Sequence, residues 1–363
     1  MKLDKNNPIP LYYQLSELLK EQIEAGAIAH GDKLPSEADM LKQYDIGRMT
    51  IRNALSRLVN MGYLVKEHGR GTFCSYVIDS DEGKRLDIDV ILSLDDEYFI
   101  HYYVKAISNV LSSYGYNFII HDSKNDTNHI CSLLNSIADK GSSGVIVQPS
   151  HFTCVPEDEV KHVFKRLARR NIPCIMINAS YECVENASYL VLDEHAGAAA
   201  AAQHLISRGH KRTGVVFIDE FRIFLDRRDG YINAFHQKAD LPPIAIPVVD
   251  KMGFEKEFIG TILRHKLTAV FCASDSLARS CVEYLNNVGI KVPEDFSVVG
   301  YDDSLVAEVM VPQLTSVAHP KQALGEMAAH ALIDKIHDKG NVKPFKHVFL
   351  PKLTLRESTA QRI

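Results

Sequence analysis

The sequence is short of the features that mark membrane, secreted and metal-binding proteins. No apolar stretch in its 363 residues approaches the length of a membrane-spanning helix. The opening MKLDKNNPIP has no apolar core of the signal-peptide kind. The seven cysteines form no C-x-x-C pair and no His/Cys set at metal-ligand spacing. We therefore expect a cytoplasmic protein with reduced, mostly buried thiols, no metal and no membrane association.

The motifs of common enzyme classes are also missing. There is no G-x-G-x-x-G after the first strand of the α/β pattern, no P-loop, no G-x-S-x-G and no H-E-x-x-H. Several aspartates can imitate acid/base pairs, but nothing beside them resembles a nucleophile or a metal set. The sequence thus predicts no catalytic residues and no cofactor, with an enzyme as the weaker alternative.

An overall positive charge is missing too. The formal net charge is −5, which excludes a protein that coats nucleic acid through general basicity. Positive charge is instead local, since residues 46–76 carry five basic side chains and one acidic side chain. The basic residues are Arg48, Arg52, Arg57, Lys66 and Arg70. A cluster of this kind is what binding to phosphates requires.

This basic segment has the pattern of a helix followed by a hairpin. Its apolar residues recur at helical spacing and form one face, made of Ile51, Ala54, Leu55, Leu58 and Val59. Gly62 ends the helix, and residues 64–65 and 72–73 predict two strands around the tight turn 69–71. The arginines, Arg57 included, fall mostly outside the apolar face, so we expect them to be free to meet a ligand.

Two more helices are predicted upstream. Leucines and isoleucines between Leu11 and Ile23 space out the first helix. Ser36 can cap the second, with Asp39 three residues later completing a near capping box. Helix, helix, turn, helix and hairpin make a winged helix-turn-helix. The bland alternative is a solvated amphipathic helix beside a spare hairpin.

Four phrases within this region, PLYYQLSELLKEQIEAG, GDKLPSE, RMTIRNAL and G-x-GTF, resemble the DNA-binding domain of the GntR family of bacterial transcription regulators. The resemblance covers roughly residues 8–75. Gly47 and Ala38 stand where that family usually has Ser and often has Arg. A recognition helix and a basic wing suit two grooves of one duplex. The expected DNA-binding residues are Arg48, Thr50, Arg52, His68, Gly69 and Arg70.

After a polar stretch at 76–87, interpreted as a linker, strand and helix patterns alternate. The apolar runs are DIDVILSL, NFIIHDS, GVIVQPS, PCIMINAS, TGVVFID, AVFCASD and FSVVGYDD. Helical patterns lie near 100–114, 128–140, 157–170, 195–208, 228–238, 276–288 and 321–338. Short runs rich in Val and Ile are typical of buried parallel strands. Their number exceeds one six-stranded sheet, so we expect an α/β fold of two doubly wound lobes.

Ligands of such sheets bind beyond the carboxyl ends of the strands. Those ends carry polar side chains that can bind hydroxyl groups: Asp95, Asp96, Gln148, Ser150, Asn178, Asp275, Asp302 and Asp303. Buried charged groups at strand ends need partners, which favours a functional role. Asp303 can alternatively cap a helix.

The phrases RRDGYINAF, ASDSLA, VPEDFSVVGYDD, LTSVAHP and LPKLTLRES resemble the effector domain of the LacI/GalR regulators, over roughly residues 88–360. The resemblance implies a two-lobed fold like that of periplasmic sugar-binding proteins, with three crossovers. It predicts lobe 1 at about 88–190 and 319–340, and lobe 2 at about 191–318 and 341–363, after a DNA-binding domain at 1–75.

The resemblance also implies effector-binding roles. It assigns them to Arg227 in RRDGY, Asp275 in ASD, Asp302 in GYDD and His319 in TSVAHP. The further candidates are Tyr98, Gln148, Asn178 and Asp193. Charged planar groups can take adjacent hydroxyls bidentately, while an aromatic ring covers a C–H face.

The whole sequence therefore predicts a homodimeric transcription repressor that reads a palindromic operator on double-stranded DNA. A small sugar is expected to release it, and the resemblance implies L-arabinose. Two alternatives stay open. One is a regulator, possibly an activator, of another pentose or a nucleoside. The other is a sugar-binding protein without a regulatory role, which a winged helix argues against.

Overall fold

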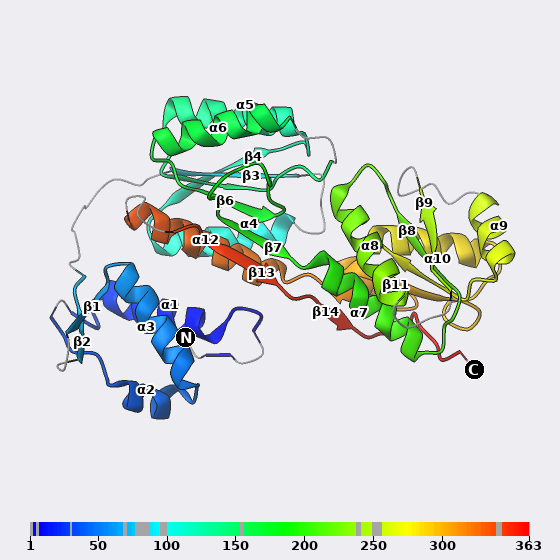
Figure 1. The fold of residues 1–363 in the computed structure, drawn as a ribbon, viewed down its shortest axis with the longest axis horizontal. Helices are drawn as coiled ribbons and strands as arrows, with labels where there is room; N and C mark the ends of the chain where they lie inside the picture. The colour runs from blue at the N-terminus through cyan, green and yellow to red at the C-terminus, as the bar shows by residue number, and fades with distance from the viewer. Residues whose placement is uncertain are drawn as a thin grey trace.

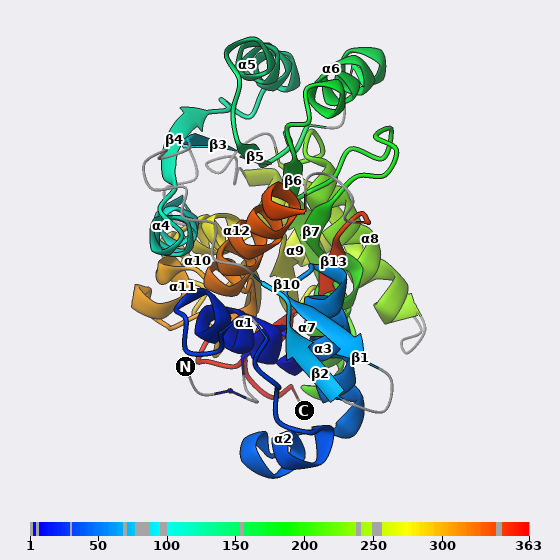
Figure 2. The same cartoon turned by 90° about the vertical axis from the view of Figure 1, so that its left-hand side faces the viewer.

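The computed structural model describes residues 3–4, 7–29, 31–67, 71–76, 87–94, 100–152, 156–236, 241–248, 256–338 and 343–362. It has a small N-terminal domain, which we call the reader, and two α/β lobes (Figures 1 and 2). Among these residues, no helix is long and apolar enough to cross a lipid bilayer.

The reader is the predicted winged helix. Its helices are α1 (Leu11–Glu24), α2 (Glu37–Tyr44) and α3 (Arg48–Asn60), followed by β1 (Leu64–Glu67) and antiparallel β2 (Gly71–Cys74). The capping box at Ser36 and Asp39 is confirmed, since each side chain bonds the backbone of the other residue. Leu15, Ile51 and Leu58 lie in a small core of the reader, as the helical spacing predicts.

The first lobe is built on a six-stranded sheet of order β13-β7-β6-β5-β3-β4. In chain order these strands are β3 (Asp87–Leu92), β4 (Asn117–Asp122), β5 (Gly144–Val147), β6 (Cys174–Asn178), β7 (Tyr189–Leu192) and β13 (Lys346–Phe349). The neighbouring strands of this sheet run parallel. Its helices are α4 (Ile100–Ser113), α5 (Thr127–Lys140), α6 (Glu157–Arg169) and α12 (Lys321–His337).

The second lobe has a six-stranded sheet of order β14-β12-β11-β10-β8-β9. These strands are β8 (Thr213–Phe217), β9 (Ile244–Pro247), β10 (Ala269–Cys272), β11 (Ser297–Asp302), β12 (Thr315–Ala318) and the antiparallel β14 (Lys352–Thr354). Its helices are α7 (Glu194–Ser207), α8 (Arg222–His236), α9 (Lys256–His265), α10 (Asp275–Asn287) and α11 (Leu305–Val309).

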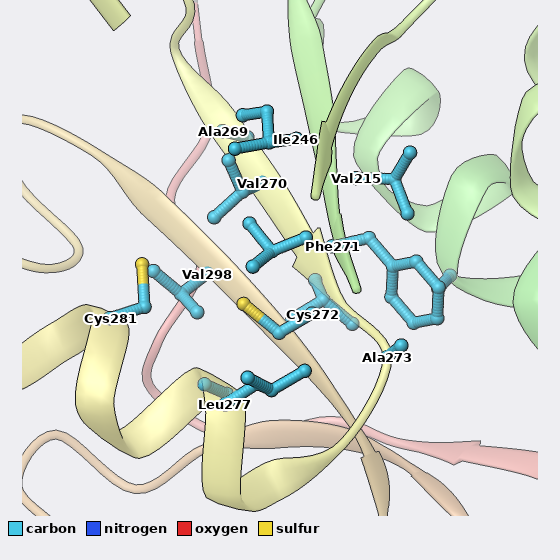
Figure 3. Packing of buried hydrophobic residues seen from close by; sticks show 14 of the residues in the cluster. Val215, Ile246, Ala269, Val270, Phe271, Cys272, Ala273, Leu277, Cys281 and Val298 are labelled. Atoms are coloured by element: carbon cyan, nitrogen blue, oxygen red, sulfur yellow. The ribbon is translucent and has the colours of Figure 1, made fainter. Parts of the chain in front are cut away.

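The sheets are held by continuous apolar strands, as the Val- and Ile-rich runs predict. In the second lobe, Val215, Val270, Phe271 and Val298 from neighbouring strands are fully buried. Figure 3 shows them packed with Cys272 and Cys281, which serve as small apolar side chains. Burial on both faces explains why these strands show no alternation of polar residues.

The chain passes between the lobes after β7, after β12 and between β13 and β14. One expected boundary is wrong. Residues 341–363 were assigned to the second lobe, but Lys346–Phe349 pairs with Tyr189–Leu192 in the first lobe. Only the segment from β14 onward joins the second lobe. The error arises because the sheet that takes a short strand depends on partners far away in the sequence.

Candidate DNA-reading surface and inter-lobe site

The N-terminal end of α3 presents the residues expected to read DNA. Gly47 is its N-cap, and Arg48 and Arg52 are exposed while Thr50 is half-buried. Arg52 Nε lies 3.0 Å from Glu37 Oε2 of α2, and both side chains remain accessible. An exposed ion pair of this kind is weak enough to be exchanged for a phosphate or a base edge. The roles of Arg48, Thr50 and Arg52 at DNA stay predictions.

Arg57 does not belong to this surface. The helical pattern predicts it to be free for a ligand, but its side chain is half-buried between the reader and the first lobe. Its Nη1 lies 2.6 Å from Glu17 Oε1, and its Nη2 pairs with Asp334 of α12. The sequence pattern could not reveal this, because the helical period shows only that Arg57 lies off the apolar face. The tip of the wing, residues 68–70 with His68, Gly69 and Arg70, lies outside the described residues.

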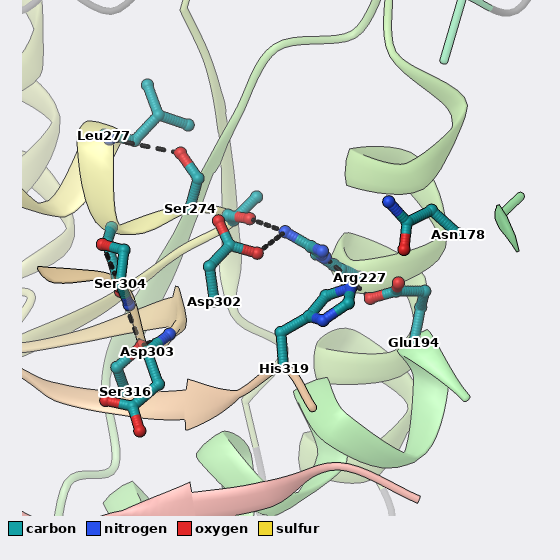
Figure 4. Close-up of polar contacts among 12 residues, drawn as sticks. Asn178, Glu194, Arg227, Ser274, Leu277, Asp302, Asp303, Ser304, Ser316 and His319 are labelled. Atoms are coloured by element: carbon teal, nitrogen blue, oxygen red, sulfur yellow. Dashed lines mark hydrogen bonds and ion pairs between the residues drawn. The ribbon is translucent and has the colours of Figure 1, made fainter. Parts of the chain in front are cut away.

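The centre of the inter-lobe site is Arg227, which α8 directs to the carboxyl ends of the second-lobe strands. Its Nε lies 2.8 Å from Glu194 Oε2, and its Nη1 lies 3.0 Å from Asp302 Oδ1 and 2.7 Å from the carbonyl oxygen of Ala273. The guanidinium stacks 3.7 Å from the centroid of the Tyr301 ring. Figure 4 shows Arg227 between Asp302 and Glu194, with the His319 ring beside it. The arrangement fixes the planar fork in one orientation.

First-lobe residues meet this cluster around His319. The Tyr103 hydroxyl of α4 donates to Asn178 Oδ1 at 2.8 Å and lies 3.3 Å from His319 Nε2. Burial, with Lys321 and Arg227 nearby, holds the pKa of His319 well below its ordinary value. The imidazole is therefore neutral near pH 7, so it can both donate to and accept from hydroxyl groups.

A second first-lobe group lies after β5. The Gln148 amide nitrogen is 3.0 Å from Nε2 of His151, and burial, with Arg227 as the further cause, lowers the pKa of His151 to about 4. The lobes touch here, because the carbonyl oxygen of His151 accepts from the backbone N–H of Arg222 at 2.7 Å. Phe152 and Phe221 add a ring contact with centroids 5.1 Å apart. Polar groups of both lobes thus converge on one buried region.

The backbone at these strand ends is unusual. Asn178, Asp302 and Asp303 adopt positive φ angles of 65°, 109° and 47°. Residues other than glycine rarely adopt this backbone region, and such conformations cluster at binding sites. Two of these residues, Asn178 and Asp302, belong to the inter-lobe cluster.

Two of the expected effector residues, Asp275 and Asp193, form hydrogen bonds within the fold, and their effector roles stay predictions. Asp275 accepts from the backbone N–H of Ser304 at 2.7 Å, from its hydroxyl at 2.8 Å and from the Ser316 hydroxyl at 2.6 Å. Both its oxygens are therefore used inside the second lobe. Asp193 caps α7 by accepting from the backbone N–H of Ala196 at 2.8 Å. Tyr98, with Asp95 and Asp96, lies outside the described residues.

Sequence reasoning missed three members of the cluster: Glu194, Tyr103 and His151. Glu194 follows the predicted Asp193, so the carboxylate that pairs with Arg227 is one residue further along the chain. Tyr103 occurs in a helical pattern where packing alone accounts for an aromatic residue. His151 follows the strand-end residues Gln148 and Ser150, which was the one usable signal. The four expected residues that do meet here are Gln148, Asn178, Arg227 and Asp302, with His319 beside them.

Two family matches agree with this geometry. Residues 11–74 match the family described as bacterial regulatory proteins, gntR family. Residues 202–359 match the periplasmic binding protein-like domain. The chain therefore joins a GntR-type helix-turn-helix domain to a periplasmic-binding-protein-like α/β domain.

Relatives similar over nearly the full length share this combination. An arabinose metabolism transcriptional repressor of Halalkalibacterium halodurans is 29% identical over 365 residues, which cover 96% of each chain. A protein of the same name from Geobacillus stearothermophilus is 28% identical and covers 98% of this chain and 100% of its own. A reader joined to a sugar-binding fold fits a sugar-responsive repressor.

Solved structures support the fold of the lobes. A LacI family transcriptional regulator from Enterococcus faecium with bound ribose has a TM-score of 0.64 and 23% identity, covering 76% of this chain and all of its own. A cellobiose complex of the transcriptional regulator CelR has a TM-score of 0.64 and 22% identity, covering 90% of this chain and all of its own. At these identities the likeness concerns the fold alone.

Proposed function

We propose that the protein is a transcription repressor that leaves its operator when L-arabinose binds between the lobes. One observation carries the proposal: a single chain joins an exposed recognition helix to a buried cluster of hydrogen-bonding groups shared by two lobes. The full-length similarity to arabinose metabolism transcriptional repressors supports the choice of sugar. The reader without the lobes would have no ligand site, and the lobes without the reader would have no DNA-binding helix, so regulation by a ligand needs both.

The chemistry of the cluster suits a small polyol. The Arg227 fork and the Glu194 and Asp302 carboxylates can donate to and accept from neighbouring hydroxyls. Neutral His151 and His319, with Asn178, offer further donors and acceptors without adding charge. Sugar must bind one arrangement of the lobes better than another in order to act, and a near-complete switch needs about 5.5 kcal/mol of that bias.

We further propose that a homodimer reads a palindromic operator. A group of exposed apolar side chains on and after α11 supports a contact with a second copy. Leu305, Val309 and Val311 are 49%, 67% and 85% exposed. Water-exposed apolar side chains grouped in this way are typical of interfaces.

The test combines calorimetry and operator binding with the same sugars: L-arabinose, xylose, ribose, galactose and a nucleoside. L-Arabinose at 100 times its Kd should raise the free energy of unfolding by about 2.7 kcal/mol and release the operator. Binding of another sugar with no arabinose heat would replace the effector and keep the regulator. Arabinose binding that tightens the operator complex would reverse the sign. No DNA binding at all would refute the proposal.

A further inference from the structure

The reader is joined to the first lobe by a buried network of ion pairs. Lys20 Nζ of α1 lies 2.8 Å from Asp334 Oδ1 of α12, and the Lys20 side chain is fully buried. Arg57 of α3 pairs with the other oxygen of Asp334 and with Glu17 of α1. We call these four residues, Glu17, Lys20, Arg57 and Asp334, the latch. The latch joins two reader helices to one lobe helix (Figures 1 and 2).

The charges of the latch are matched. Burial by itself would raise the pKa of Glu17, but His330, Arg57 and Lys20 together hold it below its ordinary value. His330 Nδ1 lies 2.8 Å from the second Glu17 oxygen. Burial would lower the pKa of Lys20, yet Asp334 and Glu17 raise it. A partly opened contact would leave buried charges without partners and without water, which is costly. The reader is therefore either fully docked on the lobe or fully apart from it.

Apolar packing adds to the contact. Ile9 and Tyr13 of the reader belong to the buried cluster of the first lobe, and they are 6% and 1% exposed. The Tyr13 ring lies 4.2 Å under the Arg57 guanidinium and 6.1 Å from the Phe345 ring. The reader is therefore held in a defined orientation, and not only by the polypeptide that joins it to the lobe.

The other end of α12 lies at the inter-lobe site. Lys321, its first residue, donates from Nζ to the carbonyl oxygens of Asp302 and Asp303 at 2.5 and 3.0 Å. His319 precedes it by two residues. The helix has 17 residues and is therefore about 25 Å long. It packs along α4, which carries Tyr103 of the same site. One rigid helix thus touches the candidate sugar site at its start and the reader near its end.

Docking leaves the recognition end of the reader uncovered. Arg48 and Arg52 at the start of α3 are exposed, whereas Arg57, on the last turns of the same helix, is in the latch. Docking therefore fixes the direction of the recognition helix without blocking it. When a dimer binds a palindromic operator, two readers that are already held in a fixed orientation lose little conformational freedom, so binding is less costly in entropy.

We infer that the latch positions the reader for operator binding, and that α12 transmits the state of the inter-lobe site to the latch. The inference rests on the proposed function and adds its route of regulation. The sugar binds better when Asp302, His319 and Lys321 are rearranged. That rearrangement moves the start of α12 and so weakens the docking of the reader on the first lobe. The undocked readers then lose their shared orientation on the operator.

The test uses the full-length protein and two DNA probes. One probe is a palindromic operator selected from random DNA with the wild-type protein, and the other has one half-site scrambled. Asp334→Asn breaks the latch from the lobe side and Glu17→Gln breaks it from the reader side. Asp338→Asn, the same substitution four residues later at the C-cap of α12 and outside the latch, is the control.

Both latch variants should bind the full operator roughly 10-fold more weakly, yet bind the single half-site within about two-fold of wild type. L-Arabinose should still bind them in calorimetry but change their operator affinity little. In the wild type, arabinose should speed amide exchange in α1. The control should behave as wild type throughout.

Two results would overturn the inference. One is latch variants that bind and leave the full operator as the wild type does. The other is an equal loss on the full operator and the half-site, which would mean that the variants damage the reader itself. If wild-type protein ignores arabinose, the proposed effector fails. The comparison of the full operator with the half-site needs no sugar, so it still tests whether the latch positions the reader for operator binding.

Discussion

Replacing Arg227 by Met tests the inter-lobe site most directly. The guanidinium is 3% exposed and faces the carboxylates of Glu194 and Asp302 at 2.8 and 3.0 Å. Met fills a similar volume but leaves two buried carboxylates without a cation. Breaking a buried pair in this way costs about 3–5 kcal/mol. We therefore expect the free energy of unfolding to fall by about that amount at pH 7.

A second variant separates charge from geometry. Arg227→Lys keeps a cation but loses the planar fork, so it should cost less, about 1–3 kcal/mol. Both variants should lose arabinose binding, because neither presents two parallel donors. Arg228→Met is the matched control, since the Arg228 side chain is 27% exposed and its ion pair is with the neighbouring, partly exposed Asp229. It should change the free energy of unfolding by less than about 1 kcal/mol.

The measurement is urea unfolding followed by circular dichroism, with arabinose calorimetry and operator binding on the same samples. Operator binding should survive in the absence of sugar, and release by sugar should be lost. An Arg227→Met protein with wild-type stability would refute the reasoning about buried charge. An Arg227→Lys protein that binds arabinose as the wild type does would refute the role of the fork.

Three further predictions concern other parts of the chain. Arg48→Ala should weaken operator binding by about 1–3 kcal/mol and relax its base preference, whereas Arg264→Ala on the exposed surface of α9 should not; titrations of variant operators decide this. Arg70→Ala should weaken specific and scrambled DNA alike and flatten the salt dependence, and a loss confined to the operator would assign Arg70 to base reading. Burial raises the pKa of Asp275 from 3.8 to about 6, although the hydrogen bonds from Ser316 and Ser304 act to lower it. The ionised form of Asp275 is thus disfavoured in the folded protein. As the pH rises from 4 to 7, the free energy of unfolding of the wild type should fall by about 2–3 kcal/mol relative to that of Asp275→Asn. Curves of unfolding free energy against pH that run parallel for the two proteins would contradict this.

Much of the architecture follows from local patterns. The helical period and the capping box of Ser36 and Asp39 were sufficient to predict the helices of the reader, and the capping box is confirmed. The apolar runs located seven strands of the two lobes, because a strand buried on both faces must be apolar throughout. The strands β7, β9, β12, β13 and β14 were missed, since a strand of three or four residues is often too short to show a pattern.

Local patterns also predict polar side chains at the carboxyl ends of the strands, where the inter-lobe cluster lies. Gln148, Asn178 and Asp302 lie at or beyond the ends of parallel strands, which meet at one edge of each sheet, and helix α8 brings Arg227 to them. These local patterns do not indicate which partner each aspartate has. Asp275 and Asp302 both follow apolar strands, yet Ser304 and Ser316 occupy Asp275 while Arg227 takes Asp302.

The sequence by itself thus determined most helices, the long strands, the class of each domain and the region of the site, because these depend on spacing along the chain. The tertiary structure decided the roles of single charges. Arg57 and Arg52 both lie off the apolar face of α3, but Arg57 is half-buried against Asp334 whereas Arg52 lies on the surface with Glu37. The partner of Arg57 is 277 residues away along the chain. Burial and pairing depend on such distant neighbours, and no helical period records them.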